Sequence, residues 1–576
     1  MKRYLKTIAL MLLTPFFSEC GQAQVDTESG FFEYKEIYLP EGISEAKKLG
    51  LNNVEEDWGI WGHNLSKALP KKNISMSIYA AVGGTRTKEQ FCFSSDQLYN
   101  YLEEYIDDNF SSSKTQRFAI LPNDNALVCQ CDLCRKAGNT ATDASPAVFN
   151  LIKRLAERFP HHQFFASYYL STKGLPKESL PDNTGVLVSA MDYPLSPVNT
   201  PQENEFESLL RTWKKYVNHV YVWDYINNFD DYFTPYPIFN VMQRRIWLYA
   251  QSGVTGIFLN GSGDDYSSMS RLKTYVLADL MKDPTRDWKE LVREYCHQFF
   301  PVSGDEIASY IYLFEATFAK YGKPLPMYEG VEKIMKSYFL PEEFSPFHMR
   351  LLELLHKTSD DEREALTYMT QAFCLTRLEI KRVNKHIHDG TSELLSMLND
   401  MSNNNFHSYN ESYWSIHDYM REYREMIEHD MVYGDKNLLK GVELVPLTPL
   451  DEDYNDISIL TDGQLGLPSN YHCGQLISSA NPALRISIPH VNGMRKLRVS
   501  FTNNAIFRIA LPTSVQLSIG GVQIASVVPK PSPNAPNRSF VEFNIPASAS
   551  GSMILTVVRN KAVKTMALDE IEGFEN

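Results

Sequence analysis

Carboxylate, amide and aromatic side chains gather where the β-rich runs in the first half of the chain end. Each of the following residues lies in the last part of such a run or just after it: Glu36, Asp57, Trp61, His63, Asn64, Asn123, Asp124, Tyr168, Asp192, Tyr193, Trp223, Asp224, Tyr225 and Asn260. Planar amides and carboxylates bind sugar hydroxyls, aromatic rings stack on sugar faces, and a protonated carboxyl supplies an acid. The set therefore predicts a carbohydrate site made of substrate-binding and catalytic groups.

Three aspartates of this set are candidates for catalytic carboxylates, in the order Asp124, Asp224 and Asp192. A pair of carboxylates performs most glycoside hydrolysis, and the distance between them decides the stereochemistry. Each aspartate alone also has a structural interpretation, because Asp124 lies in a PNDN turn and Asp224 in a WDY strand where a salt bridge would satisfy it. Side chains of this kind at nearly every strand end favour a binding cleft.

Eight β-rich runs alternate with helical segments between residues 24 and 285. The runs cover 31–39, 54–62, 74–82, 116–122, 162–170, 185–191, 219–225 and 254–260. The segments between them carry apolar residues at helical spacing, as at Leu98, Leu102 and Ile106. We therefore expect a multidomain α/β protein whose first domain, 24–285, is a (β/α)₈ TIM-type barrel with its catalytic groups at the carboxyl ends of the strands.

The remaining chain changes character twice. Residues 286–436 have helical spacing and little β signal, which predicts an α-helical domain. Residues 437–576 alternate short β-rich segments with turns, which predicts a β-sandwich of the jelly-roll type. The segments ILTDGQLG (459–466) and MALDEIEGF (566–574) resemble galactose-binding-like, discoidin-type domains, either sugar-binding or purely structural. Because the strand-end residues all precede position 270, the sandwich is not expected to take part in the chemistry.

Four cysteines of the first half are close in sequence or in the predicted fold: Cys92, Cys129, Cys131 and Cys134. Four thiols are enough for a tetrahedral structural zinc ion. Two disulfides are the alternative in an exported protein, and buried free thiols are a third. The CxC and CxxC spacing places three sulfurs in one loop, which favours the metal. In each case the cluster would stiffen the segment after Asp124, and no cofactor is expected for catalysis.

Charge and the N-terminus restrict partners and location. The net charge of −14 argues against nucleic acid, since a phosphate backbone requires a basic face. Residues 1–23 begin with the basic segment MKRYLK and continue in an apolar run too short to span a bilayer, which predicts a signal peptide. The protein is thus expected to be exported, as a periplasmic, cell-surface or secreted protein. Processing follows either small-residue cleavage after Ala23 or lipidation of Cys20, which would anchor the protein to an outer membrane.

The order of several motifs resembles a large Bacteroidetes family called domain of unknown function 4838. The motifs lie within residues 31–320 and read WGHN, QFCFSS, LPND with CQCDLC, YVWDYINNF with PYPIFN, SGVTGIFLNG and LKTYVLADLMKDP. The resemblance implies a hexosaminidase-type barrel and an activity like that of glycoside hydrolase family 163, whose members are endo-β-N-acetylglucosaminidases on complex N-glycans.

The same resemblance implies retaining, substrate-assisted hydrolysis. The 2-acetamido oxygen of the substrate attacks the anomeric carbon, one carboxylate orients the acetamide, and an acid protonates the leaving oxygen. Hexosaminidase-type barrels have an Asp-Glu pair at the end of the fourth strand, where this chain has Asn123 and Asp124.

We therefore expect a glycoside hydrolase that acts on a glycan or glycoprotein, in the first place a retaining endo-β-N-acetylglucosaminidase on N-glycans. One alternative is a glycan-binding protein on a catalytically inactive barrel, which Asn123 at the expected place of an acidic residue favours. The other is a glycosidase for a different sugar, such as an α-glucuronidase-like enzyme.

Overall fold

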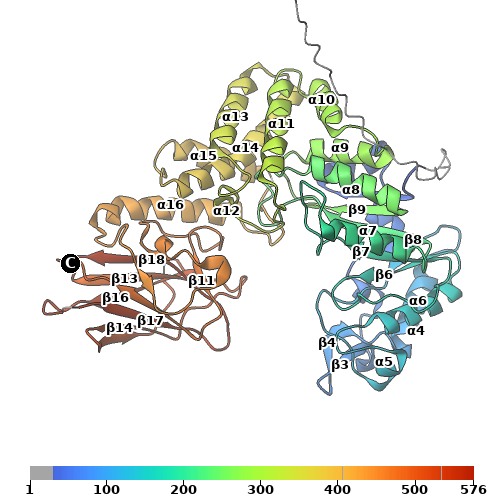
Figure 1. The fold of residues 1–576 in the computed structure, drawn as a ribbon, viewed down its shortest axis with the longest axis horizontal. Helices are drawn as coiled ribbons and strands as arrows, with labels where there is room; N and C mark the ends of the chain where they lie inside the picture. The colour runs from blue at the N-terminus through green and yellow to red at the C-terminus, as the bar shows by residue number, and fades with distance from the viewer. Residues whose placement is uncertain (1–29, 405, 534, 550, 576) are drawn as a thin grey trace, which may run out of the picture.

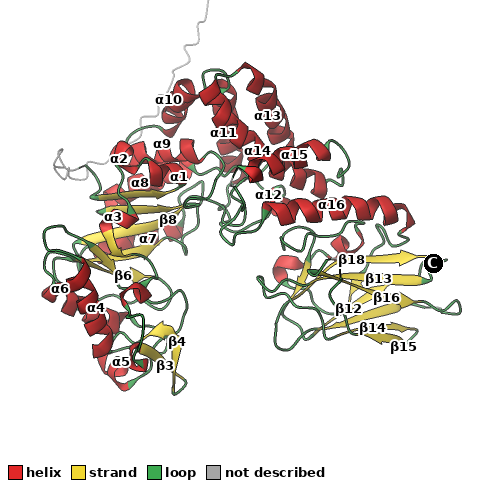
Figure 2. Ribbon diagram, turned by 180° about the vertical axis from the view of Figure 1, so that it is seen from behind, coloured by secondary structure: helices red, strands yellow, loops and turns green. Residues whose placement is uncertain are grey.

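The computed structural model describes residues 30–575 apart from 405, 534 and 550. The predicted signal peptide, residues 1–23 with Cys20, lies outside the described residues. The chain forms an arch of three parts: a sheet covered by helices, a group of helices at the top, and a pair of β-sheets (Figure 1). The helices at the top join the two legs of the arch (Figure 2).

The first part contains a curled, seven-stranded parallel sheet of order β1-β9-β8-β7-β6-β5-β2. Its strands are β1 (Tyr34–Tyr38), β2 (Trp58–Ile60), β5 (Arg117–Ala119), β6 (Gln163–Tyr168), β7 (Thr184–Ser189), β8 (His219–Tyr225) and β9 (Gly256–Asn260). From β2 through β5 to β9 the strands lie in the sheet in chain order, and the first strand, β1, pairs with the last, β9, which leaves β1 and β2 as the edges. The sheet is therefore a half-barrel whose carboxyl strand ends all face one side.

The expected eight-stranded, fully closed barrel is not what the chain forms. The third predicted run, 74–82, contributes a short turn of helix, η2 (Met76–Ile78), and strand β3 (Tyr79–Val82), which pairs antiparallel with β4 (Thr85–Phe91) outside the main sheet. Gly83 and Gly84 both have positive φ, of 57° and 84°, and form the tight turn between the two strands. Because this turn folds the run back on the next segment, it pairs locally and does not enter the sheet.

Two features bridge the break between β1 and β2: the hydrogen bonds of Asn52 and a contact between aromatic rings. The Asn52 N–H donates to Lys35 O at 2.7 Å, and the Asn52 side-chain oxygen accepts from the Lys35 N–H at 2.9 Å. Inside the curl, the Tyr34 ring of β1 meets the Trp58 ring of β2 edge-on, with centroids 5.8 Å apart. Both rings are buried with Tyr221 in one apolar cluster that fills the concave face.

Helices cover the outer face of this sheet, and the largest apolar core lies between them and the strands. They are α1 (Pro40–Ser44), α2 (Ala46–Leu49), α3 (Val54–Asp57), η1 (Leu65–Ala68), α4 (Asp96–Asn109), α5 (Asp132–Ala137), α6 (Ser145–Arg158), α7 (Pro201–Trp213), α8 (Phe239–Ser252) and α9 (Ser270–Lys282). Ser95 and Thr200 cap α4 and α7, each accepting a hydrogen bond from a backbone N–H of the first turn.

The second part is helical. It consists of α10 (Trp288–Phe299), α11 (Gly304–Tyr321), α12 (Val331–Ile334), α13 (Pro341–Leu354), η3 (Leu355–Lys357), α14 (Asp360–Val383), α15 (Thr391–Asn403), α16 (Ile416–Tyr433) and η4 (Gly434–Lys436). The Tyr310 and Phe347 rings stack between α11 and α13 with centroids 4.0 Å apart. Buried Glu315 of α11 accepts a hydrogen bond from the Phe239 N–H at the start of α8, so the helical part is tied to the first part through a helix N-terminus.

The third part is a β-sandwich of two antiparallel sheets, of order β10-β12-β17-β14-β15 and β11-β18-β13-β16. Its elements are β10 (Val445–Pro446), η5 (Glu452–Tyr454), η6 (Ile457–Thr461), β11 (Leu476–Ser478), β12 (Ala483–Ile488), β13 (Lys496–Thr502), β14 (Ser514–Ile519), β15 (Val522–Val527), β16 (Arg538–Asn544), β17 (Met553–Val558) and β18 (Met566–Phe574). Alternate residues such as Leu484 and Ile486 of β12 meet Leu497 and Val499 of β13 in a separate core.

A buried carboxyl group belongs to the interior of the first sheet. Glu36 of β1 is 3% exposed and accepts hydrogen bonds from the Tyr34 hydroxyl and from the Val54 N–H, the latter at 3.2 Å. Burial raises its pKa to about 8; the two hydrogen bonds act to lower the pKa, and the charge of Asp57 adds to the rise. Glu36 is therefore protonated at neutral pH.

Glu36→Gln should change how stability depends on pH. The folded pKa of about 8 lies above the unfolded value, so the folded chain keeps a proton that the unfolded chain loses, and the free energy of unfolding falls as pH rises from below 5 to 8. Glutamine does not titrate. We expect the stability of E36Q relative to the unchanged protein to rise by about 3 kcal/mol between pH 5 and pH 8, measured by urea unfolding. E104Q, at an exposed position of α4, is the control, and a difference for E36Q that is flat with pH would contradict the assignment.

Candidate active site

A cavity of about 210 Å³ opens at the carboxyl ends of the sheet strands, where sites of barrel folds lie. It is lined by His63, Leu121, Asp124, Ser167, Tyr169, Leu187, Ser189, Met191, Trp223, Tyr225, Asn260, Tyr328 and Glu411. The loops and strand ends after β2, β5, β6, β7, β8 and β9 all contribute. Five of the predicted site residues meet here, namely His63, Asp124, Trp223, Tyr225 and Asn260.

Two lining residues come from the helical part of the chain. Tyr328 precedes α12 and Glu411 precedes α16, and both are held by the loop between β8 and α8 (residues 226–238, the β8–α8 loop). The Glu411 N–H donates to Phe229 O at 3.0 Å. The Asn228 amide donates to Glu329 O at 2.7 Å and accepts from the Glu329 N–H at 3.2 Å, which fixes the segment beside Tyr328. A second carboxyl group thus enters the cavity from a segment almost 300 residues beyond Asp124.

Asp124 is held in a loop that a neighbouring hairpin clamps. The Asn123 N–H donates to the Gln90 side-chain oxygen at 2.9 Å, and the Gln90 amide donates back to Asn123 O at 3.1 Å. The Tyr169 hydroxyl donates to Met191 Sδ at 3.7 Å and lies near Asp124. Burial and the neighbouring Asp124 raise the pKa of Tyr169 to about 12, so Tyr169 keeps its proton.

Glu411 lies in a different electrostatic environment. Burial raises its pKa above the ordinary value, the hydrogen bond from Tyr328 acts to lower it, and the charges of Asp230 and Asp124 raise it further. The protonated form of Glu411 is therefore favoured more than in an exposed glutamate. A carboxyl group that keeps its proton beside a carboxylate is the arrangement from which general acid catalysis starts.

The aromatic floor of the cavity is built from stacked rings. Trp223 lies parallel to Trp61, with centroids 5.0 Å apart and an interplanar angle of 6°, and both meet the Phe258 ring edge-on. Trp61, predicted to bind substrate, lies behind Trp223 and outside the cavity lining. Its part is to support the ring that the substrate would meet.

Asp224, the second candidate for catalysis, is not part of the cavity. It is 0% exposed and bonds to Arg245 at 2.7 Å and to the Tyr249 hydroxyl at 2.5 Å, both on α8. Alternate residues of a strand point to opposite faces, so Trp223 and Tyr225 face the cavity while Asp224 faces the helices. Its place is that of a buried ion pair between β8 and α8.

The alternation of side chains along a strand also explains why Tyr168 lies outside the cavity. Phe165, Ser167 and Tyr169 share the inner face at the end of β6, whereas the Tyr168 ring packs outward against Trp213 at 6.2 Å. The alternation in QFFASYY is visible in the sequence and favours Tyr169 over its neighbour.

Other predicted residues bond outside the cavity. Asp192 pairs with Lys173 at 2.6 Å in an exposed loop, and Tyr193 stacks on Phe206 with centroids 4.1 Å apart. Asp57 accepts from the Asn52 amide at 2.9 Å, the Asn64 side chain from Ser66 at 3.1 Å, and the Asn123 amide donates to Glu89 O at 2.9 Å. Glu36 lies within the sheet interior described above.

The sandwich reaches the β8–α8 loop. The His472 ring bonds to Asp230 through Nε2 at 2.8 Å, and the Tyr471 hydroxyl donates to the same carboxylate at 3.3 Å. Asp230 is adjacent to Phe229, whose carbonyl holds the backbone of Glu411. A domain that the sequence places apart from the chemistry therefore contacts the loop that positions a cavity carboxyl group.

Residues 45–315 match the family described as domain of unknown function DUF4838. No curated protein matches the chain. A family GH115 4-O-methyl-α-glucuronidase with specificity for decorated arabinogalactans shares 12% identity over 84% of this chain and 67% of its own, with a TM-score of 0.36. A GH138 enzyme targeting pectin rhamnogalacturonan II shares 9% over 86% and 79%, with a TM-score of 0.26. The lectin domain of lectinolysin complexed with Lewis B antigen shares 14% over 24% and 97%, with a TM-score of 0.20.

Asp224→Asn should destabilise the protein because it removes the 2.7 Å partner of the buried Arg245 guanidinium and leaves the more distant Glu203, at 4.0 Å, as its counter-charge. We expect a loss of about 3–5 kcal/mol in the free energy of unfolding, measured by urea unfolding. Asp192→Asn removes an exposed pair and should change stability by less than about 0.5 kcal/mol. An Asp224→Asn protein of full stability would show that the ion pair does not hold β8 to α8.

Proposed function

We propose that the protein is a glycoside hydrolase whose active site is this cavity, with Asp124 and Glu411 as its two catalytic carboxyl groups. The observation that carries the proposal is their meeting in one cavity, at the carboxyl ends of the strands, beside tryptophan and tyrosine rings. The volume of about 210 Å³ is smaller than the roughly 300–1,000 Å³ of sites for drug-sized ligands. It suits a single sugar unit at the bond to be cleaved.

Glu411 is the general acid in this proposal. Its raised pKa favours the protonated carboxyl, which donates its proton to the glycosidic oxygen as the bond to the anomeric carbon breaks. The resulting carboxylate then accepts a proton from the water that completes hydrolysis. Tyr328 lies beside Glu411 in the cavity lining.

Asp124 acts on the other side of the reaction. In substrate-assisted cleavage the acetamido oxygen attacks the anomeric carbon. A carboxylate accepts a hydrogen bond from the acetamide N–H and stabilises the positive charge that develops. The two hydrogen bonds between Gln90 and the Asn123 backbone hold the loop that carries Asp124 for this part. Apolar side chains of Leu121, Leu187 and Met191 lie on the same lining and suit an acetamido methyl group. We propose on this basis an N-acetylglucosaminidase that retains configuration.

Endo-acting cleavage of N-glycans is the finer form of the proposal, with a glycan or glycoprotein as the partner. It is supported by the motif resemblance to glycoside hydrolase family 163. We further propose export of the protein, free or anchored through Cys20, by a bacterium of the Bacteroidetes. Within residues 30–575 that the structure describes, no helix is both long and apolar enough to cross a membrane.

The alternatives are weakened by the cavity. An α-glucuronidase-like enzyme must bind the carboxylate of a uronic acid, yet the described residues of the lining include no lysine or arginine, and two carboxyl groups would repel that anion. A glycan-binding protein without activity is favoured by Asn123, but Asn123 does not line the cavity and Glu411 supplies a second carboxyl group there.

Glu411→Gln and Asp124→Asn should separate the two roles. We expect each to lower kcat on an N-glycan or an unactivated N-acetylglucosaminide more than about a hundredfold. On a 2,4-dinitrophenyl N-acetylglucosaminide, whose leaving group needs no proton, E411Q should retain its rate of glycosidic cleavage while D124N stays slow. The loss of activity at high pH, which follows deprotonation of Glu411, should disappear in E411Q on this substrate.

Asp192→Asn is the control for this pair because Asp192 lies outside the cavity, and its kinetics should be unchanged. A thiazoline analogue of the cyclised acetamide should inhibit the unchanged enzyme competitively. If E411Q lost kcat equally on the unactivated and the 2,4-dinitrophenyl substrates, Glu411 would not be the general acid. Binding of glycans without turnover of any of these substrates would favour the glycan-binding alternative.

His472→Ala should lower activity although His472 lies in the sandwich. The change removes a bond to Asp230 and loosens the β8–α8 loop that holds Glu411, and misplacement of a catalytic group is costly. We expect kcat to fall about tenfold with the folded state retained, as judged by circular dichroism. His490→Ala, at an exposed position of the same sandwich, should have no effect. Unchanged kinetics in H472A would show that the sandwich does not support the site.

A further inference from the structure

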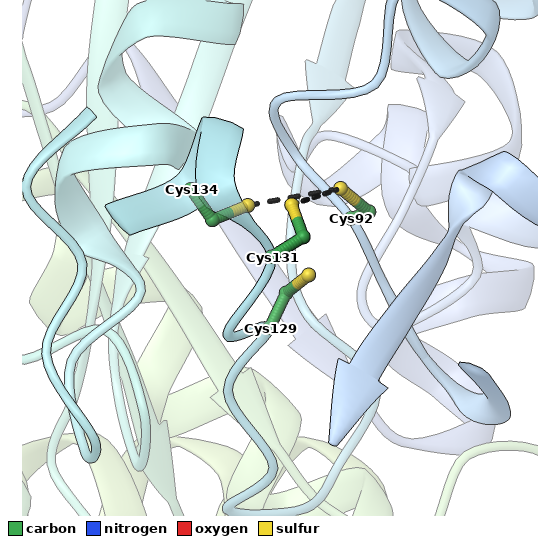
Figure 3. A group of neighbouring side chains, drawn as sticks. All are labelled: Cys92, Cys129, Cys131 and Cys134. Atoms are coloured by element: carbon green, nitrogen blue, oxygen red, sulfur yellow. Dashed lines mark hydrogen bonds between the residues drawn. The ribbon is translucent and has the colours of Figure 1, made fainter. Parts of the chain in front are cut away.

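Four cysteine sulfurs, those of Cys92, Cys129, Cys131 and Cys134, converge on one point (Figure 3). Cys92 follows β4, Cys129 and Cys131 lie between β5 and α5, and Cys134 lies in α5. All four Sγ atoms lie within 4.8 Å of one another, and Cys92 Sγ is 3.6 Å from Cys131 Sγ and 3.7 Å from Cys134 Sγ.

These separations are those of sulfurs around a shared ion. Zinc–sulfur bonds of about 2.3 Å in a tetrahedral arrangement place the sulfurs about 3.8 Å apart. A disulfide needs about 2.05 Å. Two disulfides would also draw the sulfurs into two separate pairs, whereas Cys92 is near both Cys131 and Cys134.

The surroundings suit thiolates. Cys92, Cys129 and Cys134 are at most 2% exposed. The Ala81 N–H donates to Cys129 Sγ at 3.2 Å, a bond of the kind that stabilises a metal-bound sulfur. The Arg86 guanidinium lies near Cys92, Cys129 and Cys131. Four thiolates on a divalent ion carry a net charge of −2, which this cation partly balances.

We propose that Cys92, Cys129, Cys131 and Cys134 form a structural site for one zinc ion. Four protein sulfurs close the tetrahedral coordination and leave no position for water or substrate, so the ion supplies stability and takes no part in the chemistry.

The site ties the β3–β4 hairpin to the loop that carries Asp124. Cys92 belongs to the hairpin side, and the other three ligands belong to the loop side. Gln90, two residues before Cys92, forms both hydrogen bonds to the backbone of Asn123, and the Gln130 N–H donates to Ala81 O at 2.8 Å. Release of the ion would therefore loosen the clamp on Asp124, a consequence that rests on the proposed function, whereas metal binding itself does not.

Metal content of the full-length protein tests the site. We expect about one zinc ion per chain by elemental analysis after purification without chelators, and loss of most of it in Cys134→Ser. Cys296→Ser removes a buried thiol elsewhere and should keep the ion. Replacement of zinc by cobalt(II) in the unchanged protein should give the visible and near-ultraviolet bands of a tetrahedral tetrathiolate, so the test holds even if C134S does not fold.

Two outcomes would overturn the proposal. One is a metal-free protein whose intact mass is lower by four hydrogens, with no free thiols among these four cysteines after unfolding, which would establish two disulfides. The other is a metal-free protein with all four thiols free that does not take up added zinc.

The link to Asp124 has its own readout. Removal of the ion by a chelator should increase hydrogen exchange in segments 79–92 and 122–134, and it should lower kcat on a small glycoside, with both effects reversed by zinc. If exchange became faster without loss of activity, the proposed metal site would stand, but the proposed role of Asp124 in catalysis would be contradicted. If hydrogen exchange stayed the same in a protein shown to have lost zinc, the ion would not be what holds the hairpin to the Asp124 loop.

Discussion

The β8–α8 loop is the constraint on which the rest of the structure depends. All of its residues, 226–238, are buried, so its backbone groups must find partners within the protein. The partners come from far along the chain: the Phe229 N–H donates to Met327 O at 2.7 Å, and the Tyr232 N–H donates to Tyr409 O at 2.8 Å. Buried Asp231 bonds to the backbone of Thr234 and closes the loop upon itself. The hydrogen bonds that the backbone of this buried loop requires thus hold the helical part against the half-barrel.

This docking also completes the lining of the candidate site. The half-barrel alone contributes one carboxyl group to the described cavity lining, Asp124. The segment around Tyr409 adds Glu411, whose pKa is raised by partial burial and by the charges of Asp230 and Asp124. The proposed acid-assisted cleavage requires two carboxyl groups in one cavity.

Both carboxyl groups are positioned from outside the sheet. Glu411 is held by the β8–α8 loop, which the sandwich in turn contacts through His472 and Asp230. Asp124 is held by Gln90 of the β3–β4 hairpin, beside the four cysteines. The run that fails to become an eighth strand therefore has a consequence for the site, since the hairpin it forms is the support of the Asp124 loop. Two supports of the candidate site, the β3–β4 hairpin and the sandwich, thus contribute no residue to the described lining.

Local patterns in the sequence determined a large part of this protein. Hydrophobic spacing and strand-end polarity identified seven strands of the sheet, three of the longer helices of the first part (α4, α6 and α7) and five residues of the cavity, because these properties are set by periodicity and by neighbours in sequence. Parity along β6 and β8, also visible in the sequence, separates Tyr169 from Tyr168 and Trp223 from Asp224. Only the tertiary structure decided that 74–82 turns back into a hairpin, that Asp224 pairs with Arg245, and that Glu411 faces Asp124. Pairing of a strand and the environment of a carboxyl group depend on contacts between distant segments. No local pattern around Glu411 records that its backbone will bond to a loop almost 200 residues before it.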